Sequence, residues 1–255
     1  MEIKNRHFIV TGGASGLGAA VCELLVECGG KVTIADLNEE LGTRFAKSLD
    51  GIIQFIKTDI TSEESAISTV SKAVETFGPL SGLINCAGVP GAKRVIGRDG
   101  PHDLPTFSKI VSVNLIGTFN MIRLVADVMQ TNDLTPDLER GVIINTASVA
   151  TYDGQVGQAA YSASKGGVAS MTLPIARELA QFGIRVMTIA PGLFKTPMME
   201  VLPEDVQESL GKAVPFPQRL GSPSEYAALA KHIIENCMLN GEVIRLDGAI
   251  RLAPK

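Results

Sequence analysis

Residues 7–18, HFIVTGGASGLG, decide how this chain folds. An apolar run that can form a strand leads directly into Gly12, Gly16 and Gly18, and a helical pattern follows to about residue 28. Glycines permit a tight turn and let backbone N–H groups approach an anionic ligand, whose charge is favoured at a helix N-terminus. The spacing is GxxxGxG, which predicts either a phosphate-binding loop between strand and helix or a glycine-rich turn without a ligand.

Short apolar runs alternate with longer amphipathic stretches along the rest of the chain. The apolar runs predict strands at about 7–11, 31–36, 52–57, 80–86, 142–146, 184–190 and 243–246. The amphipathic stretches predict helices at about 17–28, 38–49, 61–77, 106–130, 159–182 and 224–236. Asn38 is a candidate N-cap, and Thr61 with Glu64 forms a candidate capping box.

Strands that are apolar throughout and alternate with helices are typical of a parallel sheet that is covered on both faces. We therefore predict an α/β fold: a single doubly wound Rossmann domain over residues 1–255. The sheet should have about seven parallel strands, with helices on both faces.

Composition excludes several classes of partner. The chain has 255 residues and a net charge of −4, so it lacks the basic balance typical of proteins that bind nucleic acid. No apolar run reaches about 18 residues, the length that suggests a membrane span. The N-terminal residues enter a strand pattern at once, without the features of a signal peptide. We therefore expect a cytoplasmic protein that binds neither nucleic acid nor membrane.

The sulfur and imidazole side chains form no pattern typical of a metal site. The cysteines lie in apolar segments without CxxC spacing, which predicts buried, reduced thiols at Cys22, Cys28, Cys86 and Cys237. The histidines are scattered along the chain as His7, His102 and His232. We therefore expect no bound metal.

A carboxylate at the end of the second predicted strand indicates which nucleotide the glycine loop would hold. Asp36 stands where a carboxylate can accept hydrogen bonds from the adenosine ribose hydroxyls of a dinucleotide. Such a carboxylate repels a 2′-phosphate, and residues 12–20 contain no Lys or Arg to offset the repulsion. The sequence therefore predicts NAD rather than NADP; an ordinary Asp at a helix entry is the alternative interpretation.

Tyr161 and Lys165 are spaced so that both side chains lie on one face of a predicted helix. A phenol has a pKa near ~10, and a fixed cation beside it favours the anion. The pair is therefore a candidate proton-transfer site, with Ser148 available as a second hydroxyl. A YxxxK pair alone arises by chance, but together with a nucleotide loop on the same sheet it is specific.

These motifs together resemble the short-chain dehydrogenase/reductase family, and the resemblance covers nearly the whole chain. Residues 11–18 look like the family's cofactor loop, and Asn85-Cys86-Ala87-Gly88 looks like its structural NAG element with a cysteine added. The resemblance implies a catalytic tetrad of Asn114, Ser148, Tyr161 and Lys165. It implies that NAD contacts Gly12, Ser15, Gly16, Leu17, Gly18, Asp36, Asp59, Ile60, Asn85, Ala87, Gly88, Tyr161, Lys165, Pro191, Gly192, Phe194 and Thr196.

The resemblance also implies how the tetrad works. Tyr161, as phenolate, would take the proton of a substrate hydroxyl while NAD⁺ takes a hydride from the carbinol carbon. Lys165 would lower the phenol pKa and bind the nicotinamide ribose, and Ser148 would hold the substrate oxygen. Asn114 would anchor a water that connects Lys165 to solvent.

The substrate side of the site is expected in two places. Residues 193–218 form a long, Met-containing segment after a predicted strand, which is typical of a mobile lid over an apolar substrate. The candidate substrate contacts are Ser148, Gln155, Gln158, Met198 and Met199. In residues 90–105, the basic side chains could meet the phosphates of coenzyme A, although a solvated loop is the commoner role; they are Lys93, Arg94 and Arg98.

Four functions fit these observations. Residues 141–161 and 190–194 are most similar to family members that interconvert 3-hydroxyacyl-CoA and 3-oxoacyl-CoA with NAD, which makes this the leading hypothesis. The alternatives are an NAD-dependent dehydrogenase of another secondary alcohol such as a hydroxysteroid, a 3-oxoacyl-carrier-protein reductase, and a non-catalytic NAD-binding scaffold. The reductase would be expected to use NADPH, against Asp36, and a scaffold typically loses the Tyr or the Lys. The family also implies a homotetramer.

Overall fold

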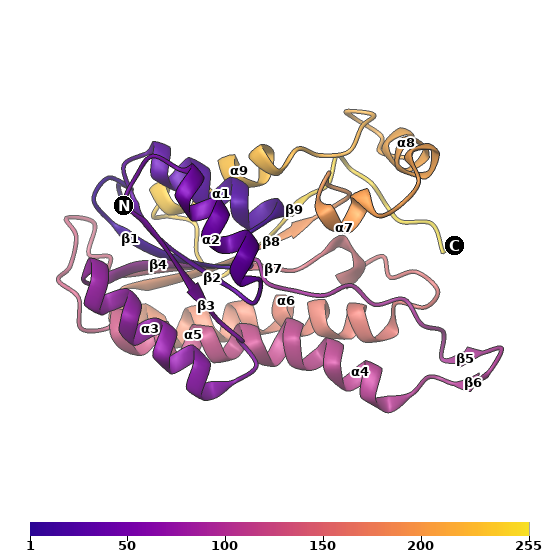
Figure 1. Ribbon diagram of the computed structural model, residues 1–255, viewed down its shortest axis with the longest axis horizontal. Coiled ribbons are helices and arrows are strands. Elements are labelled where there is room, and N and C mark those ends of the chain that lie inside the picture. The colour runs from indigo at the N-terminus through magenta and orange to yellow at the C-terminus, as the bar shows by residue number, and fades with distance from the viewer. Residues whose placement is uncertain (255) are drawn as a thin grey trace.

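A seven-stranded parallel sheet forms the centre of the computed structural model, which describes residues 1–254 (Figure 1). The strand order is β3-β2-β1-β4-β7-β8-β9. These strands are β1 (His7–Thr11), β2 (Lys31–Asp36), β3 (Ile53–Lys57), β4 (Leu80–Asn85), β7 (Gly141–Thr146), β8 (Ile184–Pro191) and β9 (Val243–Leu246). The predicted α/β fold with its doubly wound sheet is therefore confirmed.

Helices cover both faces of the sheet. One face carries α1 (Gly16–Glu27), α2 (Glu39–Ser48) and α9 (Pro223–Glu235) (Figure 1). The other carries α3 (Glu63–Phe77), α4 (Leu104–Val111), η1 (Ser112–Gly117), α5 (Thr118–Met129) and α6 (Ala159–Leu179) (Figure 1). The shorter elements are β5 (Ile96–Gly97), β6 (Gly100–Pro101), η2 (Val149–Thr151), η3 (Ala180–Phe182), α7 (Pro197–Glu200) and α8 (Glu204–Lys212).

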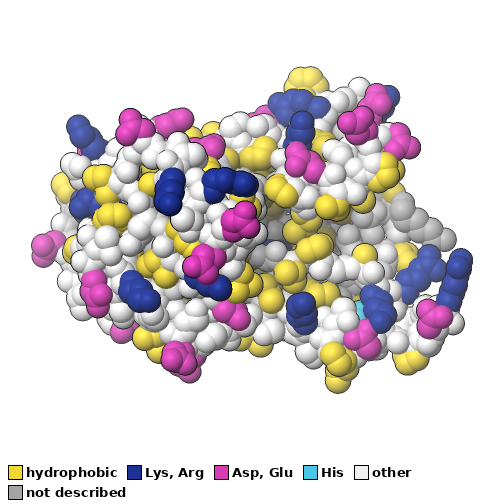
Figure 2. All heavy atoms as spheres, viewed as in Figure 1, with side chains coloured by type: hydrophobic (Ala, Val, Ile, Leu, Met, Phe, Trp, Pro, Cys, Tyr) yellow, Lys and Arg dark blue, Asp and Glu magenta, His cyan; other side chains and the backbone are white. Residues whose placement is uncertain are grey.

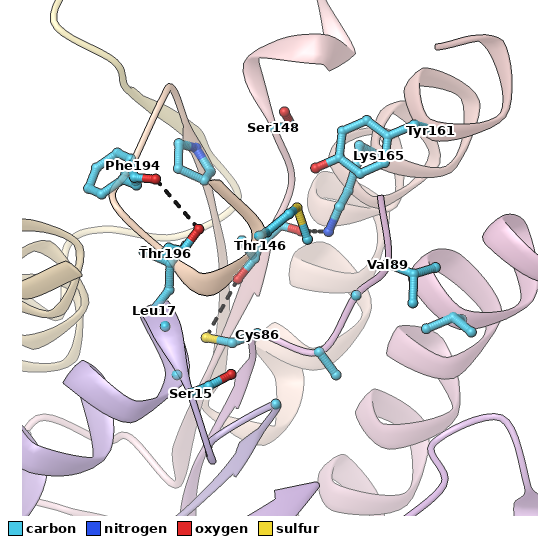
Figure 3. A pocket seen from close by; sticks show the side chains of 18 of the residues that line it. Ser15, Leu17, Cys86, Val89, Thr146, Ser148, Tyr161, Lys165, Phe194 and Thr196 are labelled. Atoms are coloured by element: carbon cyan, nitrogen blue, oxygen red, sulfur yellow. Dashed lines mark hydrogen bonds between the residues drawn. The ribbon is translucent and has the colours of Figure 1, made fainter. Parts of the chain in front are cut away.

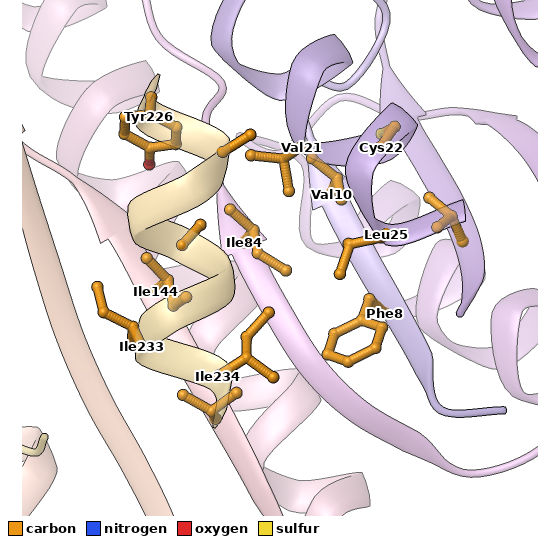
Figure 4. Close-up of a cluster of buried hydrophobic side chains, with 14 of the residues drawn as sticks. Phe8, Val10, Val21, Cys22, Leu25, Ile84, Ile144, Tyr226, Ile233 and Ile234 are labelled. Atoms are coloured by element: carbon orange, nitrogen blue, oxygen red, sulfur yellow. The ribbon is translucent and has the colours of Figure 1, made fainter. Parts of the chain in front are cut away.

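Two hydrophobic cores explain why the strands read as continuous apolar runs. Phe8 and Val10 of β1 pack with α1 and α9, whereas Ile9 between them faces the helices on the other side. Because side chains alternate across a strand, a strand buried on both faces needs apolar residues at every position. Figure 4 shows the first core, in which Leu25 of α1 and Ile234 of α9 lie over the sheet.

At the N-termini of α2 and α3, one predicted cap is confirmed and the other is wrong. The side chain of Asn38 accepts a hydrogen bond from Leu41 N, as predicted. The capping box of Thr61 with Glu64 is wrong, because Ser62 is the N-cap of α3 and accepts from Ser65 N at 3.2 Å. The Thr61 hydroxyl instead donates to Asp59 at 2.7 Å.

The helix predicted over residues 106–130 is interrupted. Its middle, η1, is a π-helical turn that contains Asn114, and such turns are often found at functional sites. The whole segment Leu104–Met129 has the length and hydropathy of a membrane span, but 50% of its most apolar window is buried inside the protein. Packing against the sheet, α3 and α6 accounts for that apolar character.

The prediction that all the cysteines are buried is wrong at one position. Cys22 is buried, and Cys28 and Cys86 are partly buried, but Cys237 lies exposed just after α9. Within the described residues, all four are free thiols.

Candidate active site

A cavity of about 470 Å³ opens at the carboxyl ends of the parallel strands. Figure 2 shows the hollow in the middle of this face, with hydrophobic side chains gathered around it. The cavity runs from the glycine loop after β1 to the N-terminal turns of α6, and residues 191–199 cross over it. The predicted residues that line it are Gly12, Ser15, Gly16, Leu17, Gly18, Asp36, Asp59, Ile60, Ala87, Gly88, Ser148, Gln155, Gln158, Tyr161, Lys165, Pro191, Gly192, Phe194, Thr196, Met198 and Met199.

The glycine loop requires glycine at each of its three signature positions. Gly12 and Gly16 have φ values of +63° and +55°, which L side chains rarely adopt. A Cβ on Gly18 would lie 2.3 Å from the carbonyl oxygen of Gly12. The loop therefore brings backbone close to the N-terminus of α1. Among the described residues, the first turn of α1 contains no acidic side chain that would offset the partial positive charge at the helix N-terminus. This arrangement fits an anionic pyrophosphate.

Asp36 is held in a fixed position at the opposite side of the loop. One carboxylate oxygen accepts from Ala14 N at 3.2 Å and the other from Asn38 N at 3.0 Å. Within residues 1–254, Lys165 is the only Lys or Arg that lines the cavity, so this end carries carboxylates without a cation. The residues fit an unphosphorylated ribose, whose hydroxyls can donate to Asp36.

Asn85 and Asn114 lie behind the cavity wall. Asn85 donates to Asn145 at 2.9 Å and accepts from Thr11 at 3.3 Å, so it ties the ends of β4, β7 and β1 together. Its side chain is buried and lies outside the cavity lining, so its contact with the cofactor stays a prediction. The Asn114 side chain accepts from Val89 N at 2.8 Å and donates to Val89 O and Ser164, both at 3.0 Å. Asn114 thus fixes the loop after β4; its water-anchoring role stays a prediction.

Tyr161, Lys165 and Ser148 meet at the inner end of the cavity. Tyr161 and Lys165 project from one face of α6, and Ser148 follows β7 as the N-cap of η2. The Tyr161 phenol and the Ser148 hydroxyl both line the cavity. Lys165 is buried and donates from Nζ to the carbonyl of Thr146 at 2.7 Å. In Figure 3, the Tyr161 oxygen and the Ser148 hydroxyl face the same space, with the Lys165 amine close to the phenol.

Burial controls the ionisation of this set. It raises the pKa of Tyr161, and the neighbouring Ser148 hydroxyl offsets only part of that effect. Burial also lowers the pKa of Lys165 to about 8. Burial thus acts against the predicted lowering of the phenol pKa by Lys165, and that effect of Lys165 stays a prediction.

Comparison with known proteins decides the family. The sequence model of the short chain dehydrogenase family matches residues 6–207. The chain belongs to this family. A 3-hydroxyacyl-CoA dehydrogenase type-2 of Drosophila melanogaster is 52% identical over 99% of this chain and 100% of its own length. Ipsdienol dehydrogenase of Ips pini is 37% identical, covering 98% of this chain and 99% of that protein. The crystal structure of 3-hydroxyacyl-CoA dehydrogenase type-2 from Mycobacterium avium has a TM-score of 0.94 and 41% identity, with 100% of both chains covered.

This short-chain dehydrogenase is therefore an oxidoreductase. Its C-terminal segment also contributes to the site, which the sequence pattern did not indicate. Leu252 lines the cavity. Gln155 donates from Nε2 to Ala253 O at 2.9 Å, and Arg245 is paired with Asp153 at 2.6 Å. These contacts fix the loop that carries Gln155. A contact between positions 98 residues apart leaves no local sequence signal.

The predicted lid contains residues with different environments. Phe194 and Val214 are buried, whereas Met198 and Met199 of α7 face the cavity. Phe216, at the end of the segment, is 82% exposed. Of the two short helices in this segment, α7 contributes to the cavity lining and α8 does not.

The basic segment 90–105 projects from the body of the protein as an arm (Figure 1). The strands β5 and β6 pair as a hairpin, and Lys93 forms an ion pair with Asp103 at its base. Arg94 and Arg98 are exposed. All three basic residues lie outside the cavity lining, which agrees with the solvated-loop interpretation.

Gly18→Ala should weaken the binding of NADH by at least about tenfold, because the added Cβ forces the loop to shift and about 1.4 kcal/mol is tenfold in affinity. The binding is measured by titration of NADH fluorescence. Gly166→Ala is the matched control, since a Cβ there meets open space among the described residues. It should bind NADH normally. Unchanged NADH affinity in Gly18→Ala would mean that the glycine loop does not hold the pyrophosphate.

Proposed function

We propose that this short-chain dehydrogenase is an NAD-dependent 3-hydroxyacyl-CoA dehydrogenase. The observation that carries the chemistry is the meeting of Tyr161, Lys165 and Ser148 in one cavity with the glycine loop and Asp36. The observation that supports the substrate is 52% identity, over nearly full length, to a protein named 3-hydroxyacyl-CoA dehydrogenase type-2.

Each of these residues has a separate role in the oxidation. When bound, NAD⁺ supplies the hydride acceptor. Ser148 holds the substrate oxygen by hydrogen bonding and stabilises charge that develops on it. Tyr161, as phenolate, removes the hydroxyl proton, and Lys165 stabilises that phenolate and binds the nicotinamide ribose. The phenol must ionise against the burial that raises its pKa, so the oxidation rate should rise with pH.

The apolar end of the cavity suits the acyl chain. Val149, Met198, Met199 and Leu252 line it, and the two Met side chains can adapt to chains of different length. Gln155 and Gln158 provide amide groups beside these residues, where they can hydrogen-bond the thioester carbonyl. We propose these residues as the substrate contacts.

The substrate proposal is tested by reduction of acetoacetyl-CoA, longer 3-oxoacyl-CoAs and ketosteroids with NADH. Affinity should increase with each added methylene by up to ~0.8 kcal/mol until the apolar end is full. Removal of the coenzyme A moiety should reduce kcat/KM far more than loss of one methylene. Inert acetoacetyl-CoA with rapid turnover of a ketosteroid, or of the ketone of a small alcohol such as ipsdienol, would exclude the acyl-CoA substrate and favour the broader alcohol dehydrogenase.

The cofactor proposal is tested at Asp36. NAD should support turnover far better than NADP, because the carboxylate accepts from the ribose hydroxyls and repels a 2′-phosphate. Asp36→Asn keeps an acceptor for the loop amides but removes the charge, so it should raise KM for NAD and narrow the ratio of kcat/KM between the two cofactors. The melting temperature provides the folding control. Equal wild-type kinetics with both cofactors would show that Asp36 does not face the ribose.

We further propose that the protein assembles as a homotetramer through the long helices. Ile116, Phe119 and Leu173 on η1, α5 and α6 are 55%, 48% and 44% exposed, although these helices pack closely within the protein. Such exposed apolar side chains on neighbouring elements are typical of subunit interfaces. Sedimentation should give the mass of a tetramer, and Phe119→Glu should give smaller species. A monomeric wild-type protein would contradict this assembly.

A further inference from the structure

The carbonyl that holds Lys165 belongs to Thr146, the last residue of β7. The Lys165 amine lies 2.7 Å from this oxygen and is almost completely buried. A buried ammonium depends on the few acceptors that replace water. The position of the Thr146 carbonyl therefore affects whether Lys165 stays charged beside Tyr161.

The Thr146 side chain is fixed by two other elements. Its hydroxyl donates to the carbonyl of Asn85, at the end of β4, at 2.6 Å. It also lies 2.7 Å from the hydroxyl of Tyr226, which comes from α9 on the far side of the sheet. A threonine hydroxyl has one proton, and Asn85 O is its acceptor, so Tyr226 is the donor to Thr146. The thiol of Cys86 lies 3.8 Å from both hydroxyls and is drawn beside Thr146 in Figure 3.

The Tyr226 ring and its hydroxyl have separate roles. The ring fills the core between α9 and the sheet (Figure 4), a position where Phe would fit equally well. The hydroxyl is fully buried, which is costly unless it is hydrogen-bonded. Its partners, Thr146 and Cys86, both line the active-site cavity. The hydroxyl thus connects the core to the wall of the site.

We propose that Tyr226 is a positioning residue of the active site: its hydroxyl orients Thr146, whose carbonyl holds the Lys165 ammonium beside Tyr161. The inference rests on the proposed function only in giving Lys165 a part in proton transfer. Without the Tyr226 hydroxyl, the Thr146 side chain is held only through Asn85, so the end of β7 is less firmly fixed and its carbonyl supports the ammonium less well. Lys165 then loses its charge at lower pH, and Tyr161 ionises at higher pH.

Other groups near Lys165 do not account for such a change. Among the described residues, the titratable groups that face it are Tyr161 on α6, Cys86 after β4 and, through Thr146, Tyr226 on α9. Burial raises the pKa of Cys86 to about 11 and that of Tyr226 well above its usual value. Both stay neutral across the pH range of the assay, so a shift in the rate profile reports on Lys165 and Tyr161.

The test is the pH dependence of kcat for oxidation in Tyr226→Phe. The rising limb should move to higher pH by about 0.5–1 unit, which lowers turnover at pH 7 by about three- to tenfold, while KM for NAD changes less than twofold. If Tyr226→Phe folds poorly, Thr146→Val provides the test: it removes the same hydrogen bond together with the one to Asn85, and should shift the limb in the same direction by at least as much. Thr146→Ser keeps the hydroxyl, so the rising limb of its pH profile should coincide with that of the wild type. The double variant Tyr226→Phe/Thr146→Val should shift the limb no further than Thr146→Val alone.

Tyr152→Phe is the matched control. Tyr152 is 52% exposed, with its ring under Arg245, so loss of its hydroxyl should leave the profile unchanged. A Tyr226→Phe profile that overlays the wild type, with only a lower melting temperature, would overturn the proposal. So would a fall in kcat that is equal at every pH. The wild-type protein tests the proposed function first: if it oxidises no 3-hydroxyacyl thioester, that function fails, and the pH comparison proceeds with whichever secondary alcohol it oxidises.

Discussion

The common direction of the seven strands is the constraint on which the site depends. Because the strands are parallel, the residues that follow them arrive at one edge of the sheet: Gly12 after β1, Asp36 at the end of β2 and Thr146 at the end of β7. β1 and β4 are neighbours, and the chain builds the sheet outward from them in opposite directions. A crevice forms at such a switch point, and the cavity lies there.

Burial in this crevice has two opposite effects on the reaction. It partly removes Tyr161 and Ser148 from water, at the place where charge develops during the reaction. It also favours the uncharged forms of Tyr161 and Lys165, which opposes proton transfer. The neighbouring polar groups favour the charged forms: the Ser148 hydroxyl for the phenol and the Thr146 carbonyl for the ammonium. The chemistry therefore depends on the precision with which strand ends are held.

The sequence allowed prediction of most of the cavity because its signals are local. Glycines at a strand–helix turn, a carboxylate at a strand end and a Tyr-Lys pair one helical turn apart each depend on near neighbours. The predictions failed where a competing hydrogen bond, or a contact between distant segments, determines the position of a side chain. Ser62 displaced Thr61 as the cap because Asp59 binds the Thr61 hydroxyl. Leu252, Tyr226 and the strand-tying role of Asn85 follow from packing between segments far apart in the chain.

The central claim is that Tyr161 transfers the proton in a site assembled by these strand ends. The most direct measurement is steady-state turnover of Tyr161→Phe beside its affinity for NADH. The change removes only the phenolic oxygen, so NADH should bind as in the wild type while turnover falls by at least ~10²-fold, the scale of a general acid–base contribution. Substantial turnover by Tyr161→Phe, with its pH dependence unchanged, would contradict the account.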